Sequence, residues 1–433
     1  MDVRGEGGED GPLGILPGGG SEISDIVGVE PNWWSGGERR RLAVRDGSVS
    51  VRDLMLPAGT IAPGLESLLQ RASNACLLFV IAFLLLGGEW AWAQQSAQAP
   101  PSQVLHKHSA PPARTIFLDV LVTEKNGQPV TGLGANDFTV LDDKRPEKIT
   151  SFKEINAKEQ PVEAIVLIDA VNTHYDIVSE ARQQIDKFLH ANGGKLPLPT
   201  VLAVLTNDGI EMQHTYTTNG NDLDAVLTQY TIGLREIRRS AGVYGDAERL
   251  DDSLKAIRLL AAYELQRPGR KIILWIAPGW PLLSGPEVTL SYDQTMSIFN
   301  QVTWLSSALR EGQVTVYSID PLGVAEPLQE LFYYQQFLAG LKKPGEAQLG
   351  NLGLQVLATQ SGGKVLNSPE VADLLTQCMA ENQDYYRISF EPPASELGEK
   401  RKAESPYEYH ALKVLVAHPG VTAATSTGYY IEP

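Results

Sequence analysis

The stretch at residues 162–173 constrains the fold of this chain more than any other, because an apolar run there stops abruptly at a carboxylate. Residues 165–168 have the composition of a buried strand and are followed at once by Asp169. A short polar loop containing Asn172 and Thr173 comes next, and a helical pattern starts a few residues later. In an open α/β sheet, ligands bind in the crevice beyond the carboxyl ends of the strands. The sequence therefore places Asp169 at the edge of the sheet where such folds keep their ligand site.

Strand and helix patterns alternate along residues 161–380, which predicts an α/β domain with a Rossmann-like, mostly parallel sheet and helices on both faces. Residues 211–217, just past a turn, are expected to add an antiparallel edge strand. The expected strands are 163–168, 201–205, 271–276, 314–318 and a short one at 364–366. The expected helices are 177–192, 222–230, 251–265 with Asp251 or Asp252 as its cap, 292–311, 348–361 and 369–380.

Two β-rich segments flank this domain. Residues 115–157 hold three short strand patterns and a tight-turn signal at Asn126-Gly127, and are expected to form a small N-terminal antiparallel β module. Residues 384–433 hold strand patterns near Tyr385, Tyr409 and Gly428, and are expected to form a C-terminal β segment.

A secretion signal is indicated upstream of these modules. The apolar core at residues 77–86 is too short to span a bilayer, which takes ~20 apolar residues, but it suits a signal peptide. Ala91-Trp92-Ala93 supplies the small-x-small pattern that precedes a cleavage site. We therefore expect residues 55–93 to be a signal peptide region cleaved after Ala93, and residues 94–114 to be a disordered linker.

The signal begins unusually far from the first residue, because 70 residues precede Arg71. Met55 would be a natural start, so residues 1–54 are expected to be either an over-extended reading frame or a disordered extension. The mature chain is expected to be exported from a bacterium, either to the periplasm or out of the cell, with no membrane span.

The composition excludes several function classes. A net charge of -16 argues against a nucleic-acid binder, which needs a basic face. Only Cys76 and Cys378 occur, and the first lies in the expected signal peptide, so neither a disulfide framework nor a zinc site of cysteine type is available.

The loop after the first strand of the α/β domain resembles the metal-binding motif of von Willebrand factor type A domains. That motif reads Asp-x-Ser-x-Ser, and this chain has Asp169-Ala170-Val171-Asn172-Thr173. The order of features before and after the domain is similar to an exported bacterial family, the VWFA-related acidobacterial domain group. The matching features include Asn126-Gly127, Asp137-Phe138 and a final Gly428-Tyr429-Tyr430. The resemblance implies a type A-like fold and a non-catalytic, adhesion-type role in protein–protein interaction.

The resemblance also implies a Mg²⁺ site, but the motif in this chain is degenerate. Asp169 and Thr173 are the metal-ligand candidates, whereas Val171 stands where the motif has its middle Ser. Residues 277–279 read Ala-Pro-Gly, where type A domains carry a second Asp, and no Thr lies between Arg239 and Leu250. We expect at most weak Mg²⁺ binding. The structural alternative is that Asp169 braces the loop by accepting hydrogen bonds from backbone N–H groups.

Four further residues are expected on the same rim, where they would contact an unknown protein partner. These are Asn172, His174, Asp208 and Trp280. Asp208 also has the context of a turn former, because Gly209 follows it. Two rival functions stay open. The first is an enzyme that uses Asp169, Asp208 and His174 as acid–base groups, and the second is a purely structural module of an envelope assembly.

Overall fold

The computed structural model describes residues 115–156, 160–233, 242–281, 289–323, 332–393, 405 and 407–431. The N-terminal extension, the signal peptide region and the linker expected from the sequence lie outside these described residues. Within the described part of the chain, no helix has both the length and the apolar character needed to cross a membrane.

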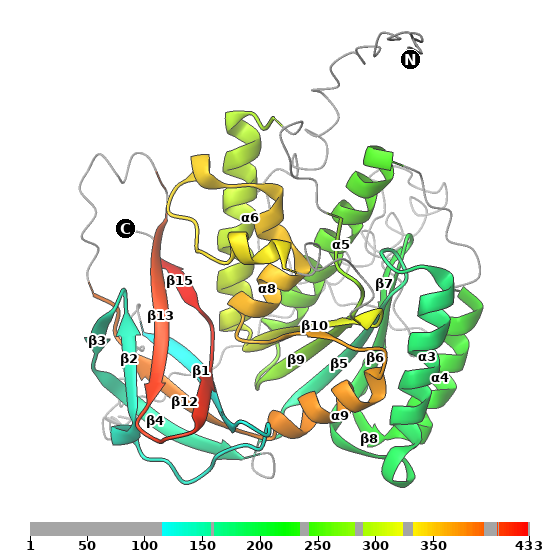
Figure 1. The fold of residues 1–433 in the computed structure, drawn as a ribbon, viewed down its shortest axis with the longest axis horizontal. Coiled ribbons are helices and arrows are strands. Elements are labelled where there is room, and N and C mark those ends of the chain that lie inside the picture. Colours follow the sequence, from blue (N-terminus) through cyan, green and yellow to red (C-terminus); the bar gives the residue numbers. More distant parts are fainter. Residues whose placement is uncertain are drawn as a thin grey trace, which may run out of the picture. The chain divides into compact units, whose positions relative to one another are not determined.

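A seven-stranded, mostly parallel sheet forms the centre of the α/β domain (Figure 1). Strand β5 (Glu163–Asp169) lies between β9 (Lys271–Ile276) and β6 (Lys195–Thr206) and is parallel to both. The sheet continues through β10 (Val314–Asp320) to β11 (Val365–Asn367), again in parallel. The prediction of a mainly parallel sheet with residues 165–168 at its centre is therefore confirmed.

The far edge of this sheet is antiparallel, as expected from the turn at Asp208-Gly209. Strands β7 (Gly209–Met212) and β8 (Thr217–Asn219) both pair with β6 in antiparallel fashion. The expected single edge strand at 211–217 is thus split into two short strands.

Helices cover both faces of the sheet, because alternate residues of the strands are buried on opposite sides. In β5, Ile165 and Leu167 belong to one core and Val166 and Ile168 to the other. The first face packs against α5 (Gly242–Glu264), α6 (Tyr292–Glu311) and α8 (Leu354–Gln360). The second packs against α3 (Tyr175–His190), α4 (Gly220–Gly233) and α9 (Val371–Glu381).

Two helices differ clearly from the expectation. The expected helix at 348–361 is divided into a 3-10 turn at Leu349–Leu352 and the short helix α8. Helix α5 begins at Gly242, so Asp251 and Asp252 lie within it and do not cap its start. The apolar period starts at Leu250, and residues 242–249 hold two glycines, three charged residues and no apolar repeat, so hydrophobic spacing alone missed the first two turns.

The flanking β segments form two four-stranded antiparallel sheets, and each sheet contains strands from both ends of the described chain. In one, β12 (Asp384–Phe390) lies between β1 (Ile116–Glu124) and β4 (Ile149–Asn156), and β14 (Val421–Ala424) pairs with β1. In the other, β13 (Glu408–Val416) lies between β2 (Phe138–Asp142) and β15 (Gly428–Ile431), and β3 (Arg145–Glu147) pairs with β2.

This pairing corrects the expectation of a self-contained N-terminal β module. Strands β1, β2 and β4 do not pair with one another, and each pairs with a strand of the C-terminal segment. Their inward residues form one core with those of β12, β13 and β15. The α/β domain is therefore inserted between β4 and β12 of one two-sheet unit. Tyr430 of β15 joins the two parts, because its ring packs edge-on against Phe299 of α6 at 6.1 Å.

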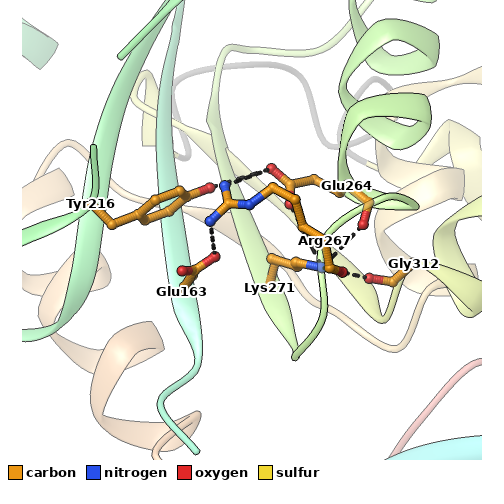
Figure 2. A network of polar contacts seen from close by, with 6 residues as sticks. All are labelled: Glu163, Tyr216, Glu264, Arg267, Lys271 and Gly312. Atoms are coloured by element: carbon orange, nitrogen blue, oxygen red, sulfur yellow. Dashed lines mark hydrogen bonds and ion pairs between the residues drawn. The ribbon is translucent and has the colours of Figure 1, made fainter. Parts of the chain in front are cut away.

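A fully buried lysine lies at the amino end of the central sheet (Figure 2). Lys271 Nζ donates to the carbonyl oxygens of Glu264 (3.1 Å) and Arg267 (2.5 Å) at the end of α5. It also donates to the carbonyl oxygen of Gly312 (3.3 Å), the C-cap of α6. A cation at the C-terminal ends of two helices satisfies carbonyl groups that have no partner within the helix.

Charged and aromatic side chains surround this lysine. The carboxylate of Glu264 lies 3.7 Å from Lys271 Nζ and accepts a hydrogen bond from the Tyr216 hydroxyl. The Arg267 guanidinium donates to Glu163 at 2.7 Å and stacks over the Tyr216 ring at 4.4 Å (Figure 2). Burial lowers the pKa of Lys271, and the negative charge of Glu264 opposes that change.

Candidate functional site

Asp169 ends β5 at the carboxyl edge of the sheet, where the sequence placed it, and its side chain is fully buried. Its Oδ1 accepts hydrogen bonds from the backbone N–H groups of Val171 and Asn172, both at 2.9 Å. Its Oδ2 accepts from Asn172 Nδ2 at 2.8 Å and from Trp275 Nε1 at 2.9 Å. Burial raises the pKa of the Asp169 carboxyl, and these hydrogen bonds partly offset the rise.

The donors around Asp169 decide how well the loop fits a metal ion. A carboxylate has about four lone-pair positions, and four N–H donors occupy them here. Val171 is fully buried and has no ligand atom, while Thr173 is buried beside it. The loop in this conformation therefore fits a metal ion poorly, and Asp169 acts as the hydrogen-bonded brace that the sequence left open as an alternative.

Asn172 connects this loop to helix α5. Its Nδ2 donates both to Asp169 and to Ser253 Oγ, each at 2.8 Å. Ser253 in turn donates to the carbonyl oxygen of Arg249, one turn earlier in α5. Asn172, predicted to contact a partner, is instead half-buried and fixes the loop to the helix beside it.

Negative charge near this loop contributes to a raised pKa of Asp252, which lies on the same helix. Burial raises its pKa to about 6, and the charges of Asp251, Glu248 and Asp169 add to the effect. Lys255 acts in the opposite direction and lies 3.9 Å from the Asp252 carboxylate. The region beside the Asp169 loop therefore carries several carboxylates and few compensating cations among the described residues.

Trp280 is not exposed on the rim where the sequence placed it. Its side chain is only 4% exposed, and its ring packs edge-on against Trp275 at 5.1 Å. The neighbouring Ala277-Pro278-Gly279 segment is held against α8, because Gln355 Nε2 donates to the Pro278 carbonyl at 3.1 Å. The prediction of Trp280 as a partner-binding residue is thus wrong for this conformation. The residue supports Trp275, which in turn holds Asp169.

His174 and Asp208 are the two predicted rim residues that reach the surface. His174 is the N-cap residue of α3, and its carbonyl oxygen accepts from Val178 N at 2.8 Å. Asp208 lies in the turn between β6 and β7, where its backbone N–H donates to Thr206 Oγ1 at 3.2 Å. Both side chains are exposed, whereas Asp169 is not.

The three residues of the enzyme alternative are not brought together. Within the described residues, two groups of His, Cys, Asp or Glu place their ligand atoms within 4.8 Å of one another, and Asp169, Asp208 and His174 form neither of them. An acid–base site made of these three residues therefore has no geometric support.

Exposed aromatic residues lie on three segments that follow strands of the central sheet, and the sequence did not identify them. Tyr175 begins α3, which follows β5, and is 63% exposed. Tyr292 begins α6, the helix after β9, and is 68% exposed. Phe332, beyond β10, is 52% exposed, and the hydroxyl of its neighbour Tyr333 donates to the Gln355 side chain at 3.0 Å. Tyr292 stood at the first residue of a predicted helix and Tyr175 two residues before one, and these positions were the signal that could have identified the two tyrosines.

No family model matches this chain, and no curated protein matches it. Among solved structures, it is similar to the human COPII-coat protein Sec24c, with 9% identity over 65% of this chain and 46% of that chain and a TM-score of 0.30. It is also similar to the N-terminal domain of TFIIH p34, with 12% identity over 52% of this chain and 99% of that chain and a TM-score of 0.25. The chain thus spans less than half of the Sec24c chain. With TM-scores this low, the fold description rests on the strand order and pairing given above.

Proposed function

We propose that this chain is an exported, non-catalytic protein-interaction module that binds its partner through the loops at the carboxyl edge of the central sheet. The observation that carries the proposal is the set of exposed aromatic residues at that edge. Aromatic residues are enriched at protein–protein interfaces, where they supply large contact areas at low conformational cost. Tyr175 and Tyr292 are among the most exposed large side chains of the described residues.

Binding is expected to be independent of a metal ion. All four acceptor positions of Asp169 are used within the protein, so an ion would have to displace N–H donors before a partner could complete its coordination. We expect Mg²⁺ affinity no better than about the millimolar range, similar to the weakest extracellular calcium modules. Isothermal titration with Mg²⁺ measures this value, and EDTA should leave partner binding unchanged.

Site-specific crosslinking tests the proposed surface. A photo-reactive amino acid placed at position 175 or 292 in the producing cell should give the same crosslinked partner band from either position. Phe117 of β1 is the matched control, because it is 47% exposed but lies in the two-sheet unit. An equal band from position 117, or none from 175 and 292, would contradict the proposed surface and would favour the structural envelope module.

The export part of the proposal has its own test. N-terminal sequencing of the processed protein should begin at or near Gln94, after the Ala91-Trp92-Ala93 site. Peptides from residues 3–52 in mass spectra of the native protein would show that the long N-terminal extension is translated. A retained segment that fractionates with membranes would make residues 77–86 an anchor.

A further inference from the structure

A cluster of two aspartates and a histidine lies in the two-sheet unit and not in the α/β domain that contains the Asp169 loop. Asp142 ends β2, Asp143 follows it in the turn to β3, and His410 belongs to β13. The backbones of the turn and of β13 are joined, because Asp143 N donates to the Ala411 carbonyl at 2.9 Å. The Asp143 carboxylate accepts from Ala411 N at 3.1 Å. Both aspartates are therefore held at fixed positions beside the imidazole.

The distances between the potential ligand atoms suit a single ion. His410 Nδ1 lies 3.0 Å from Asp142 Oδ1 and 3.9 Å from Asp143 Oδ2. One oxygen or nitrogen atom from each of the three residues lies within 4.8 Å of the others. An ion bound at about 2.0–2.2 Å from each ligand spans at most about 4.2 Å between two ligands, and about 3 Å when they meet at a right angle. The two separations from Nδ1 fall inside these limits.

The residues around the cluster are arranged like the outer hydrogen-bond partners of metal ligands. Ligating carboxylates and imidazoles are usually oriented by outer hydrogen-bond partners. The Tyr429 hydroxyl donates to Asp142 Oδ2 at 2.5 Å, and its ring stacks on the His410 ring at 4.9 Å. On the opposite side of the imidazole, Glu408 Oε1 lies 3.8 Å from Nε2, which is buried and makes no hydrogen bond. A proton held on Nε2 by this carboxylate would leave the Nδ1 lone pair for an ion.

The local charge also favours a cation. The carboxylates of Asp142, Asp143 and Glu408 all lie within 3.9 Å of a ring nitrogen of His410. Asp142 and His410 are buried, while the Asp143 side chain is 53% exposed and leaves the cluster open to water on one side. Open positions of this kind are where water completes the coordination of a bound ion.

We propose that Asp142, Asp143 and His410 form a binding site for a divalent transition-metal ion. One imidazole and two carboxylates suit Zn²⁺, Co²⁺ or Mn²⁺, whereas Ca²⁺ and Mg²⁺ prefer oxygen ligands alone. The ion would link β2 to β13, which lie on opposite sides of the inserted α/β domain in the sequence. Metal binding would therefore stabilise the two-sheet unit at the point where its two halves meet.

Titration of the metal into the full chain tests the proposal. The protein is first treated with EDTA and then titrated with ZnCl₂ by calorimetry, and with CoCl₂ to follow the visible absorption of bound Co²⁺. The starting protein carries His106→Gln and His108→Gln, because these two histidines lie outside the described residues and are a competing source of Zn²⁺ binding. We expect one site with a dissociation constant in or below the micromolar range.

Three variants in this background locate the site. Asp143→Asn should weaken binding about tenfold or more, and it should fold normally because Asn can still accept the Ala411 hydrogen bond. His410→Gln should abolish the Co²⁺ spectrum. His190→Gln is the matched control, since Asp186, His190 and Asp224 form the other His–Asp group of this size in the described residues.

The outcomes separate clearly. Loss of binding in Asp143→Asn with no change in His190→Gln supports the site, as does a melting temperature that rises with Zn²⁺ in the parent and not in Asp143→Asn. The proposal fails if the parent shows no saturable binding, or if Asp143→Asn binds like the parent. It also fails if His190→Gln is the variant that loses the ion.

Discussion

The two ends of the central sheet each hold a fully buried charge, but they satisfy it in different ways. At the carboxyl edge, Asp169 accepts four hydrogen bonds from neutral N–H groups and has no cationic partner among them. At the amino edge, Lys271 donates to three backbone carbonyl groups and also has Glu264 at 3.7 Å. The anion is held by dipoles alone, whereas the cation is held by dipoles and a countercharge.

The two edges therefore also differ in how well they could bind a partner. The amino edge is closed, because Lys271 ties the ends of α5 and α6 together inside a network of charged side chains. At the carboxyl edge, the buried carboxylate of Asp169 fixes its own loop. Tyr175 and Tyr292 remain exposed at this edge. A rigid loop that presents exposed aromatic residues is suited to binding a partner without rearrangement.

Removing the lysine should have the largest effect on stability. Lys271→Ala removes the donor that the carbonyl groups of Arg267 and Gly312 share, and it takes the nearby cation away from the buried carboxylate of Glu264. We therefore expect a loss of about 3–5 kcal/mol. Denaturant unfolding at neutral pH measures it. Lys255→Ala is the control, because its side chain is 58% exposed in its ion pair with Asp251, and its loss should stay below about 1 kcal/mol. Equal losses in the two variants would show that the amino-edge network is not specific.

Removing the aspartate should cost somewhat less, because its partners are all neutral. Asp169→Ala removes the acceptor of three N–H donors in the loop and of the Trp275 indole N–H on β9, and we expect a loss of about 2–4 kcal/mol. The loss is larger than the ~1 kcal/mol of a single helix cap, since both oxygens are used. Hydrogen exchange of the Val171 and Asn172 amides should accelerate in the same variant. A loss below about 1 kcal/mol with unchanged exchange would contradict the role of Asp169 as the brace of the loop.

The sequence predicted many of the strands and helices around Asp169 and Lys271, for a physical reason. A buried parallel strand is a continuous apolar run with sharp ends, so β9 and α6 have the boundaries expected from the pattern. The position of Asp169 followed from the end of one such run. Lys271 was not recognised, because a basic residue at the first position of a strand is typical of a solvated strand end, and the sequence does not show that two helix termini meet there.

Other features could not be predicted, because they depend on contacts between residues far apart in the chain. The pairing of Asp142 with Leu412 joins positions separated by the whole α/β domain, and no local pattern encodes it. The burial of Trp280 depends on its contact with Trp275, and its segment is held in place because Gln355 of α8 donates to the Pro278 carbonyl. The exposure of Tyr175 and Tyr292 is likewise a property of packing and not of residue type.

The pH dependence of stability should reveal the free-energy cost of the charged Asp252 side chain near the Asp169 loop. Its folded pKa of about 6 exceeds the ordinary value of 3.8, so the folded state binds a proton more tightly between these two values. Stability should therefore fall as the pH rises from about 4 to about 6, by an amount on the order of 1–3 kcal/mol. Asp252→Asn should remove this dependence and stabilise the protein at pH 7, with little effect at pH 4. Melting temperatures of both proteins across this range provide the test, and a variant less stable than the parent at pH 7 would refute it.

The smallest expected effect comes from Trp275→Phe, which removes one of the four donors to Asp169 and keeps most of the aromatic packing. Among the four donors, only the Trp275 indole N–H comes from another strand, β9. Its loss therefore tests the attachment of Asp169 to β9 apart from the hydrogen bonds within the loop. We expect a loss of about 1–2 kcal/mol, of which part is the smaller ring. In an Asp169→Ala background the same substitution should cost less, because the N–H already lacks its acceptor, and a double-mutant cycle measures that coupling. Strictly additive losses would mean that Trp275 acts only through its packing against Trp280, and that the carboxylate is held by its own loop alone.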